Sequence, residues 1–315
     1  MKTKEEIRTF FDNELLADLT DFDTRKKKAF NSVLIYRIIS IIGLLGLYFA
    51  YKYPVFLVPI SMLALLIYIK FHLYAKVKYT TEIIKIYSEY KGNIVTSALD
   101  EIFENVNYVP YQHISISAIK ESNIFGEFFN FDEGEDYFKC EIKDVVFQFS
   151  EISLSGDIAI LLPDYYKGIF GVSEFNKNFN TQTLIIPKSK IPLYKNKYQR
   201  IAGIKGFKKI HLEDPLFNKE FVVFGQDQVE SRYLLTPSLI SNILKFKKSL
   251  QSRIVFSFAE ERLNLFIINS KDLFEPPKRK SYTDFEHFYK NLNYFILFAG
   301  IVEELKLNVK IWGKN

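Results

Sequence analysis

The chain has 315 residues, of which 48% are hydrophobic and 25% are charged, an ordinary balance for a folded protein that can bury a core. Its formal net charge of +5 falls short of the clustered positive charge that marks nucleic-acid-binding proteins, although it suits a protein beside anionic lipid. Cys140 is the only cysteine, so an internal disulfide is excluded and a reducing compartment is favoured.

Residues 1–31 mix acidic and basic side chains with apolar residues at helical spacing. The apolar positions are Ile7, Phe10, Phe11, Leu15, Leu16 and Leu19. This pattern predicts an amphipathic cytoplasmic helix, and it leaves two roles open. The apolar face either packs on the protein's own domain or docks on a partner or on lipid headgroups.

Two long apolar runs follow, at residues 32–51 and 54–72. The first contains a single charge, Arg37, and the second has none before Lys70. A helix of about 20 residues is roughly 30 Å long, which matches the hydrocarbon core of a bilayer. A signal peptide would start near Met1 and end in a cleavage site of small residues. The first apolar run has neither feature, so we do not interpret it as a signal peptide.

Two other interpretations compete with membrane-spanning helices. A buried helical hairpin would need an unusually large core, because two nearly charge-free runs stand back to back. Helices lying in the membrane interface would need a polar face, which residues 38–47 lack. We therefore predict a transmembrane hairpin of two helices, residues 32–51 and 54–72.

Positive charges on both sides of the hairpin predict its orientation. They are Arg25, Lys26, Lys27, Lys28 and Arg37 on the N-terminal side, and Lys70, Lys76 and Lys78 on the C-terminal side. The turn between the two helices holds only Lys52. Because positively charged flanks stay preferentially in the cytoplasm, both termini are expected there.

Beyond the hairpin, residues 73–107 predict a connecting helical segment, and residues 108–277 predict a cytoplasmic α+β domain. Short runs with period-two alternation or β-branched and aromatic residues predict the strands of a mixed sheet. These runs are 114–117, 137–149, 167–170, 183–187 and 221–224, followed by a hairpin of 254–258 and 263–268. An acidic stretch at residues 132–136 predicts a turn.

Two helix starts are marked by a capping residue followed by proline. Asp214-Pro215 predicts a single turn. Thr236-Pro237 opens Pro237–Leu250, the one clear helix of the domain, whose apolar residues line a broad face.

The chain closes with a basic linker and a C-terminal helix within residues 278–315, the helix itself covering residues 284–305. The predicted fold class is therefore an α+β membrane protein. It has an N-terminal two-helix transmembrane hairpin, a cytoplasmic mixed-sheet domain with one clear helix, and a C-terminal helix.

Catalytic and metal-binding signatures are missing from the sequence. The four histidines lack the close spacing of a zinc site, and neither a phosphate loop nor a Gly-x-Ser-x-Gly elbow is present, so we predict no cofactor and no metal. Cys140 lies in a strand pattern, where it would act as a nucleophile only if a histidine approached it in the fold. The acidic turn at 132–136 does not match a calcium-binding loop.

The densest group of polar residues lies between residues 211 and 237. It comprises Glu213, Asp214, Asp227, Glu230 and Arg232. Its simplest role is structural, namely a polar network that fixes the start of the helix at Pro237. Acid–base catalysis would require these side chains to share a cleft, so the structural and catalytic interpretations both stay open.

Several sequence blocks resemble a bacterial membrane-protein family of unknown function. They are GEDYFKCEIKDVVFQFSEI, YKGIFGVSEFNKNF, LEDPLFNKEFVVFGQDQVESRYLLTPSLISNIL, IVFSF and DLFEPP. The resemblance covers about residues 108–277 together with the preceding hairpin. It implies a two-pass protein of the bacterial inner membrane with a cytoplasmic domain. It also implies a LemA-type membrane protein as partner, because many family members are encoded beside one. It transfers no catalytic residues.

Three functions follow as hypotheses. The leading one is a non-enzymatic, membrane-anchored cytoplasmic module that binds another protein, either a LemA-type partner or copies of itself. The alternative is a membrane-tethered, hydrolase-like enzyme that uses carboxylates of the 213–230 region. The third is a lipid-surface sensor in which Lys76, Lys78 and residues 278–280 contact anionic headgroups.

Overall fold

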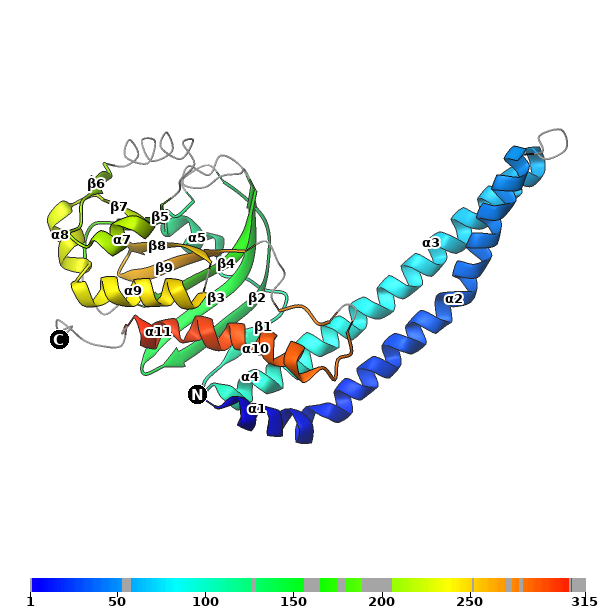
Figure 1. Ribbon diagram of the computed structural model, residues 1–315, viewed down its shortest axis with the longest axis horizontal. Helices are drawn as coiled ribbons and strands as arrows, with labels where there is room; N and C mark the ends of the chain where they lie inside the picture. The colour runs from blue at the N-terminus through cyan, green and yellow to red at the C-terminus, as the bar shows by residue number, and fades with distance from the viewer. Residues whose placement is uncertain are drawn as a thin grey trace. The chain divides into compact units, whose positions relative to one another are not determined.

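A computed structural model divides the chain into two compact units, and each is described by itself (Figure 1). The helical unit consists of residues 2–96 and 275–290, and the sheet unit of residues 97–274 and 291–315. The residues that the structure describes are 2–52, 58–125, 129–155, 165–174, 179–188, 206–250, 252–269, 274–277, 280–305 and 307.

The helical unit begins with α1 (Lys4–Phe10), which runs through a π-helical turn (Phe11–Leu15) into α2 (Leu16–Lys52). Thr3 and Glu6 form a capping box, because the Thr3 hydroxyl accepts from the Glu6 N–H and the Glu6 carboxylate accepts from the Thr3 N–H. The apolar side chains buried along this stretch include Ile7, Phe11, Leu15 and Leu19. The helix predicted for residues 1–31 is therefore present, with one apolar side buried.

The returning helix α3 (Val58–Glu89) continues through a second π-helical turn (Tyr90–Val95) into α4 (Thr96–Ile102). These elements cover most of the second predicted apolar run and the predicted connecting segment. The predicted turn between the two runs falls on residues 53–57, which lie outside the described residues.

Helices α2 and α3 pack against each other along their length (Figure 1). Gly43 marks the closest approach, since a Cβ atom there would lie 3.0 Å from the Ala64 carbonyl oxygen and 3.2 Å from the Tyr68 Cβ. The Tyr36 ring packs on Phe71, with centroids 6.0 Å apart, and on Tyr74 at 4.8 Å. Small residues at one point and stacked aromatic rings at another therefore hold the pair together.

One helical stretch within the described residues, Lys4–Gly46, is long and apolar enough to cross a membrane by its length and composition. This supports one possible membrane-spanning helix at the N-terminal end of the chain. A membrane hairpin made of both helices is taken up below as a proposal.

The segment 275–290 packs against the ends of α1, α2 and α3 within the helical unit. Tyr282 is 1% exposed and sits between Phe22 and Tyr90, with centroids 5.9 and 5.4 Å away. Lys91, in the second π-helical turn, is almost fully buried and forms an ion pair with Glu275 at 2.7 Å. Residues 184 positions apart in the chain are thereby fixed to each other.

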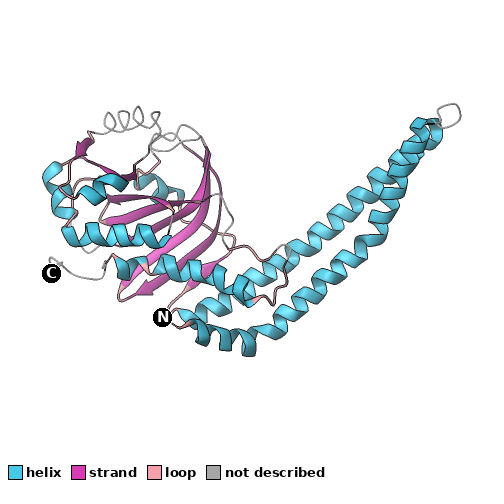
Figure 2. Ribbon diagram, viewed as in Figure 1, coloured by secondary structure: helices cyan, strands magenta, loops and turns pink. Residues whose placement is uncertain are grey.

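The sheet unit is built around a nine-stranded sheet (Figure 2). The strand order is β1-β2-β3-β4-β9-β8-β5-β7-β6. The strands are β1 (Asn107–Val109), β2 (Asn130–Ile142), β3 (Val145–Ser155), β4 (Tyr165–Glu174), β5 (Thr183–Pro187), β6 (Lys208–Ile210), β7 (Phe221–Gly225), β8 (Arg253–Ala259) and β9 (Arg262–Ile268).

Every pair of neighbouring strands among the described residues is antiparallel, so the prediction of a mixed sheet is wrong. Alternation along one strand does not specify the direction of its neighbour. Two-residue turns do, because they can only join antiparallel strands. Lys143 and Asp144 join β2 to β3, and Glu260 and Glu261 join β8 to β9, each pair with positive φ angles as such turns require.

Several predicted elements are confirmed at their positions. The predicted strand 183–187 is β5, and the predicted hairpin 254–268 is β8 and β9. The helices of the sheet unit are α5 (Ile116–Glu121), α7 (Pro215–Glu220), α8 (Gln228–Leu234), α9 (Pro237–Leu250) and α11 (Ile301–Glu304), and α10 (Phe285–Ala299) contributes residues to both units. The predicted helix at Pro237 is therefore confirmed, while the C-terminal helix is interrupted at Gly300.

Two predictions in the first part of the sheet unit are wrong. The alternating run 114–117 is not a strand, because the Ser115 hydroxyl accepts from the Ala118 N–H and caps α5 instead. The acidic stretch 132–136 is not a turn but part of β2, where two register shifts accommodate it. Asp136 lies within the second shift, between Glu135 and Phe138, with a φ of 57°, and its carboxylate accepts a hydrogen bond from the Tyr108 hydroxyl.

Each face of the sheet carries a buried apolar layer. On one face, the rings of Phe138 and Phe149 stack at 4.8 Å and meet Phe295 of α10 at 5.4 and 5.5 Å. On the other face, Ile119 of α5 and Phe125 pack into a core of buried strand residues. Figure 1 shows α9, α10 and α11 on the first face and α5 on the second. Side chains at both odd and even positions along the strands are therefore buried, since both faces of the sheet are covered.

Candidate functional site

The polar residues predicted between 213 and 232 serve mainly as helix caps and loop anchors. The Asp214 carboxylate accepts from the N–H groups of Leu216 and Phe217, at 2.8 and 2.9 Å, and so caps α7. The Asp227 carboxylate accepts from the Glu230 N–H at 2.7 Å and caps α8. Both aspartates satisfy backbone donors that a helix start otherwise leaves without partners.

Glu230 and Arg232 point to different parts of the sheet unit. The Glu230 carboxylate accepts from the backbone N–H groups of Asn180 and Thr181, at 2.6 and 2.8 Å, and from the Thr181 hydroxyl. The Arg232 guanidinium donates to the His211 carbonyl oxygen at 3.1 Å. Each side chain joins α8 to a loop, and neither contact positions a reacting group.

A small pocket of about 230 Å³ brings three of the five residues together. Its lining residues are His211, Leu212, Glu213, Asp214, Arg232, Leu235, Pro237 and Ile240. Asp227 and Glu230 do not line it. Asp214, one of the two carboxylates that line the pocket, already accepts two backbone hydrogen bonds as a helix cap, which favours the structural interpretation of this group.

A larger groove lies on the α5 face of the sheet and was not predicted from the sequence. We call it the sheet groove; its volume is about 540 Å³. Its lining residues are Asn107, Gln112, His113, Ile114, Ser115, Ala118, Tyr137, Val146, Gln148, Val172, Glu174 and Arg262. The Tyr137 hydroxyl donates to the Gln148 side-chain oxygen at 2.9 Å across its floor.

One sequence signal could have indicated this groove. Tyr137 and Gln148 alternate with Phe138, Phe147 and Phe149, so β2 and β3 present polar side chains on one face where the opposite face is aromatic. The walls, however, come from segments far apart in the chain. Their convergence depends on the strand order, which local patterns do not encode.

Cys140 is confirmed as a strand cysteine. It lies in β2 opposite Phe147 and is 1% exposed. Burial raises the pKa of the Cys140 thiol to about 12, so the thiolate needed by a nucleophile is essentially unpopulated at neutral pH. Cysteine-based catalysis therefore receives no support from this position.

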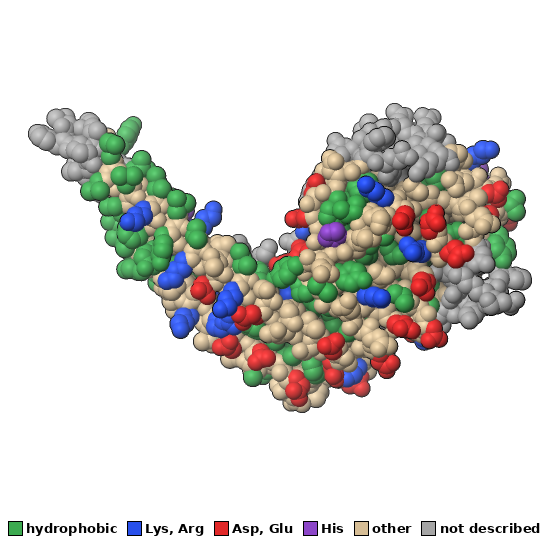
Figure 3. Space-filling view, turned by 180° about the vertical axis from the view of Figure 1, so that it is seen from behind, with side chains coloured by type: hydrophobic (Ala, Val, Ile, Leu, Met, Phe, Trp, Pro, Cys, Tyr) green, Lys and Arg blue, Asp and Glu red, His purple; other side chains and the backbone are tan. Residues whose placement is uncertain are grey.

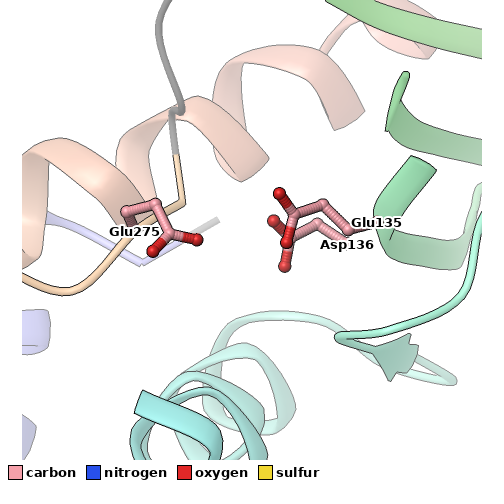
Figure 4. Close-up of side chains that lie close together, drawn as sticks. All are labelled: Glu135, Asp136 and Glu275. Atoms are coloured by element: carbon pink, nitrogen blue, oxygen red, sulfur yellow. The ribbon is translucent and has the colours of Figure 1, made fainter. Parts of the chain in front are cut away.

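Figure 4 draws three carboxylates: Glu135 and Asp136 come from β2 in the sheet unit, and Glu275 comes from the helical unit. Asp136 is buried, and its carboxylate accepts the hydrogen bond from the Tyr108 hydroxyl described above. Glu275 forms the ion pair with Lys91. Each of these two carboxylates therefore has a structural role within its own unit.

The predicted basic flank of the first apolar run is organised in the helical unit. Arg25 forms an ion pair with Glu89 of α3. The Arg37 guanidinium lies over the rings of Phe30 and Tyr79, 5.0 and 5.1 Å from their centroids. On the other flank, the Lys78 ammonium lies 5.8 Å from the Tyr36 ring. Cation–π contacts therefore fix two of the predicted flanking charges.

Apolar side chains cover much of the exposed surface of α2 and α3, with charged side chains among them, as Figure 3 shows for one face of the molecule. The apolar side chains that are at least 50% exposed on these helices include Ile35, Ile41, Ile42, Leu44, Leu45, Met62, Leu63, Leu66, Leu73 and Val77. So many large apolar side chains exposed on two neighbouring helices mark a surface for interaction with another protein or with a membrane.

Residues 164–307 match the model of DUF3137, a protein family of unknown function. The match starts later and ends later than the resemblance expected for residues 108–277, and it covers β4 to α11. No curated protein and no solved structure matches the chain. The description of this family names no activity.

Proposed function

We propose that the protein is a non-enzymatic binding or scaffold module anchored in a lipid bilayer by α2 and α3, with the sheet unit as its binding part. The observation that carries the anchoring is the exposed apolar surface of both helices. Ile42 is 61% exposed and Leu66 is 62% exposed, although both are flanked by further apolar residues. Apolar surface of this extent is unfavourable in water and favourable in a hydrocarbon core.

Both helices, rather than one, are proposed to span the bilayer. Their contact through Gly43 and Ala64 falls within both predicted apolar runs, as expected for two helices that meet inside a membrane. Most of the exposed large apolar side chains of the two helices lie between Phe30 on α2 and Val77 on α3, and Leu16 and Ile84 lie outside these limits. The basic residues outside these limits place both flanks on the cytoplasmic side of a bacterial inner membrane in this proposal.

The binding role rests on what the polar side chains of the sheet unit do. Asp214 and Asp227 cap helices, Glu230 holds a loop, and the Cys140 thiol is buried. The sheet groove is lined by hydrogen-bonding side chains, among them Ser115 and His113. The Ser115 hydroxyl bonds the Ser117 hydroxyl and caps α5, and His113 Nδ1 bonds the Ile114 carbonyl oxygen, which suits recognition better than catalysis. We propose another protein as the ligand, either a LemA-type membrane protein or a second copy of this chain.

Extraction of membranes with alkaline carbonate tests the anchoring. The full-length protein is expected to stay in the membrane pellet, and release into the supernatant would contradict the proposal. Protease digestion of intact spheroplasts and of inverted vesicles tests the orientation. Cleavage of the sheet unit is expected only in inverted vesicles.

Cross-linking in the native membrane, followed by purification in mild detergent and mass spectrometry, tests the binding role. A stoichiometric partner or a homo-oligomer is expected. The double variant Tyr137→Ala and Gln148→Ala, which strips the floor of the sheet groove, is expected to lose the partner. A variant in the small pocket, Glu213→Ala, serves as the control. A strictly monomeric protein with no stoichiometric partner would overturn this part of the proposal.

A further inference from the structure

The helical unit contains a basic pocket beside the N-terminal half of α2 and the C-terminal half of α3. Its volume is about 530 Å³. Its lining residues are Asp23, Lys26, Lys27, Phe30, Asn31, Tyr79, Lys280 and Ser281. All of them belong to the helical unit, so the pocket is a feature of that unit by itself. We call it the basic pocket.

The positive charges of the basic pocket outnumber its negative charges. Three lysines line it against one carboxylate, that of Asp23. Asp23 is occupied, because it accepts from the Ser281 hydroxyl and, at 3.1 Å, from the Tyr282 N–H. Lys280 forms an exposed ion pair with Asp284 at 3.0 Å, which solvent screens. The pocket therefore has net positive charge available to an anion.

Lys26 is held in place in the pocket by contacts with the protein. Its ammonium donates to the carbonyl oxygens of Pro277 and Lys280, at 3.0 and 3.1 Å, and lies 5.0 Å from the Tyr282 ring. These contacts fix its position and leave one of its three N–H donors for a ligand. Burial lowers the pKa of the Lys26 ammonium, and a bound anion would counteract that shift.

Lys27 has a different role, because its side chain is exposed and makes no hydrogen bond with any described residue. It follows Lys26 directly on α2 and is free to close on an anion from the solvent side. A phosphate group fits this arrangement better than a carboxylate. A phosphate offers several acceptor oxygens to ammonium groups arriving from different directions, whereas a carboxylate offers two in one plane.

The position of the pocket identifies the source of the phosphate. Phe30 and Asn31 line it and directly precede the first predicted membrane-spanning run. Phe30 is 43% exposed, and the next exposed apolar side chains along α2 are Leu34 and Ile35. A phosphate in the pocket thus lies where acyl chains attached to it could run along the apolar side of α2.

We infer that the basic pocket binds the phosphate headgroup of an anionic phospholipid. The inference rests on the proposed membrane anchoring. It goes beyond that proposal in naming a specific headgroup site and the residues that form it. Lys26 and Lys27 of α2 and Lys280 of the segment 275–290 bind the phosphate together, so lipid binding also ties these two segments to each other.

Photo-cross-linking in nanodiscs tests the site with the full-length protein. The probes are phosphatidylglycerol and phosphatidylcholine, each carrying a photoreactive group near the headgroup. Phosphatidylglycerol adducts are expected on the pocket residues in α2 and in residues 280–282. Phosphatidylcholine adducts, by contrast, are expected to be spread around α2 and α3. An equal distribution of adducts for the two lipids would overturn the inference.

Charge-removal variants measure the affinity. Lys27→Gln with Lys280→Gln is expected to weaken phosphatidylglycerol retention about ten-fold or more in native mass spectrometry, since a basic residue near anionic lipid contributes about 1 kcal/mol. Lys208→Gln with Lys209→Gln, two exposed residues of β6, removes the same charge elsewhere and is expected to change nothing. Equal weakening in both double variants would assign the effect to net charge and overturn the site.

Two further measurements separate the possible failures. Lys27→Glu alone, at a side chain without hydrogen-bond partners among the described residues, reverses the charge without disturbing packing and is also expected to lose selectivity. Glycerol phosphate binding to the protein in phosphatidylcholine nanodiscs, with displacement of phosphatidylglycerol, would make this a site for soluble phosphates and overturn the lipid assignment. Release by carbonate overturns the anchoring itself, whereas retention without lipid selectivity overturns only the headgroup site.

Discussion

The helix pair α2–α3 and the sheet unit use the same apolar residue types and place them in opposite ways. Phe149 and Phe266 in the sheet are fully buried, whereas Ile42 and Leu66 on the helices are more than half exposed. The sheet unit builds its own apolar interior, whereas in the proposed anchoring a lipid bilayer would provide one for the helix pair. The difference shows that composition matters less than whether the fold supplies a second apolar layer.

Truncating one apolar side chain in each of the two regions is expected to give the largest difference in the loss of stability. Phe149→Ala removes a ring packed on Phe138, Phe274 and Phe295 and is expected to lower the free energy of unfolding of the sheet unit by about 3–5 kcal/mol. Leu45→Ala, at a side chain 53% exposed on α2, is expected to change the free energy of unfolding of the helical unit by less than about 0.5 kcal/mol.

Hydrogen exchange of the full-length protein in detergent measures both changes, read for peptides of the sheet unit in Phe149→Ala and of the helical unit in Leu45→Ala. A loss of similar size for Leu45→Ala would mean that α2 packs on protein at this position and would remove the contrast between the two regions.

Adding a charge to an exposed apolar position tests the medium around each region. Ile42→Asp places a carboxylate near the middle of the first predicted span, where insertion is expected to cost about 2.5–3.5 kcal/mol. Val229→Asp makes the same kind of change at a side chain 78% exposed on α8 in the sheet unit and is expected to be nearly neutral. The measurement is the fraction of each variant that resists carbonate extraction. Equal resistance of the two variants would contradict a bilayer around α2.

Substitutions of Asp227 test whether the polar residues between 213 and 232 have a structural or a catalytic role. Asp227→Ala is expected to cost about 1 kcal/mol of sheet-unit stability, because the Glu230 N–H loses its acceptor. Asp227→Asn keeps an oxygen that can accept this hydrogen bond and is expected to restore most of the loss. Denaturant unfolding checks both variants. Full stability of Asp227→Ala would show that the cap is not needed.

His287 is expected to give the helical unit a modest pH dependence. Burial lowers its pKa below the ordinary value of 6.5, and its Nε2 atom is buried without a hydrogen-bond partner among the described residues. The unfolded chain therefore binds a proton at a higher pH than the folded chain does. Stability is complete above about pH 6.5 and falls as the pH drops from there toward the folded pKa.

The matched variants for this test are His287→Phe and His211→Phe. The first is expected to flatten the pH dependence of hydrogen exchange in peptides of the helical unit, and the second, at an exposed residue of the sheet unit, is expected to leave it unchanged. An unchanged pH dependence in His287→Phe would assign the titration to another group.

Local signals predicted elements well where neighbouring residues alone decide the conformation. The Asp214-Pro215 pair opens α7, and the Thr236 hydroxyl accepts from the Leu239 N–H at the start of α9, as a cap followed by proline predicts. The β8–β9 hairpin was also recognisable, because two strand patterns flank a two-residue turn. In each case the interactions that define the element lie within a few residues.

Predictions failed where a distant contact decided between two local possibilities. Ser115 interrupts an alternating run of four residues, and its capping of α5 is stabilised by burial of Ile119 in the sheet core. The acidic stretch 132–136 stays in β2 because the Asp136 N–H donates to the Pro110 carbonyl oxygen and its carboxylate accepts from Tyr108. Neither partner is visible in the local pattern.

The sequence by itself determined the two apolar runs, the positive charges beside them and the capped helices, because length, charge and caps are properties of contiguous residues. Only the tertiary structure decided the order of the nine strands and the sheet groove that follows from it. It also brought Lys280 beside Lys26, a contact across 254 positions that forms the basic pocket. Such contacts depend on burial shared between distant segments, and no local pattern specifies which segments will share it.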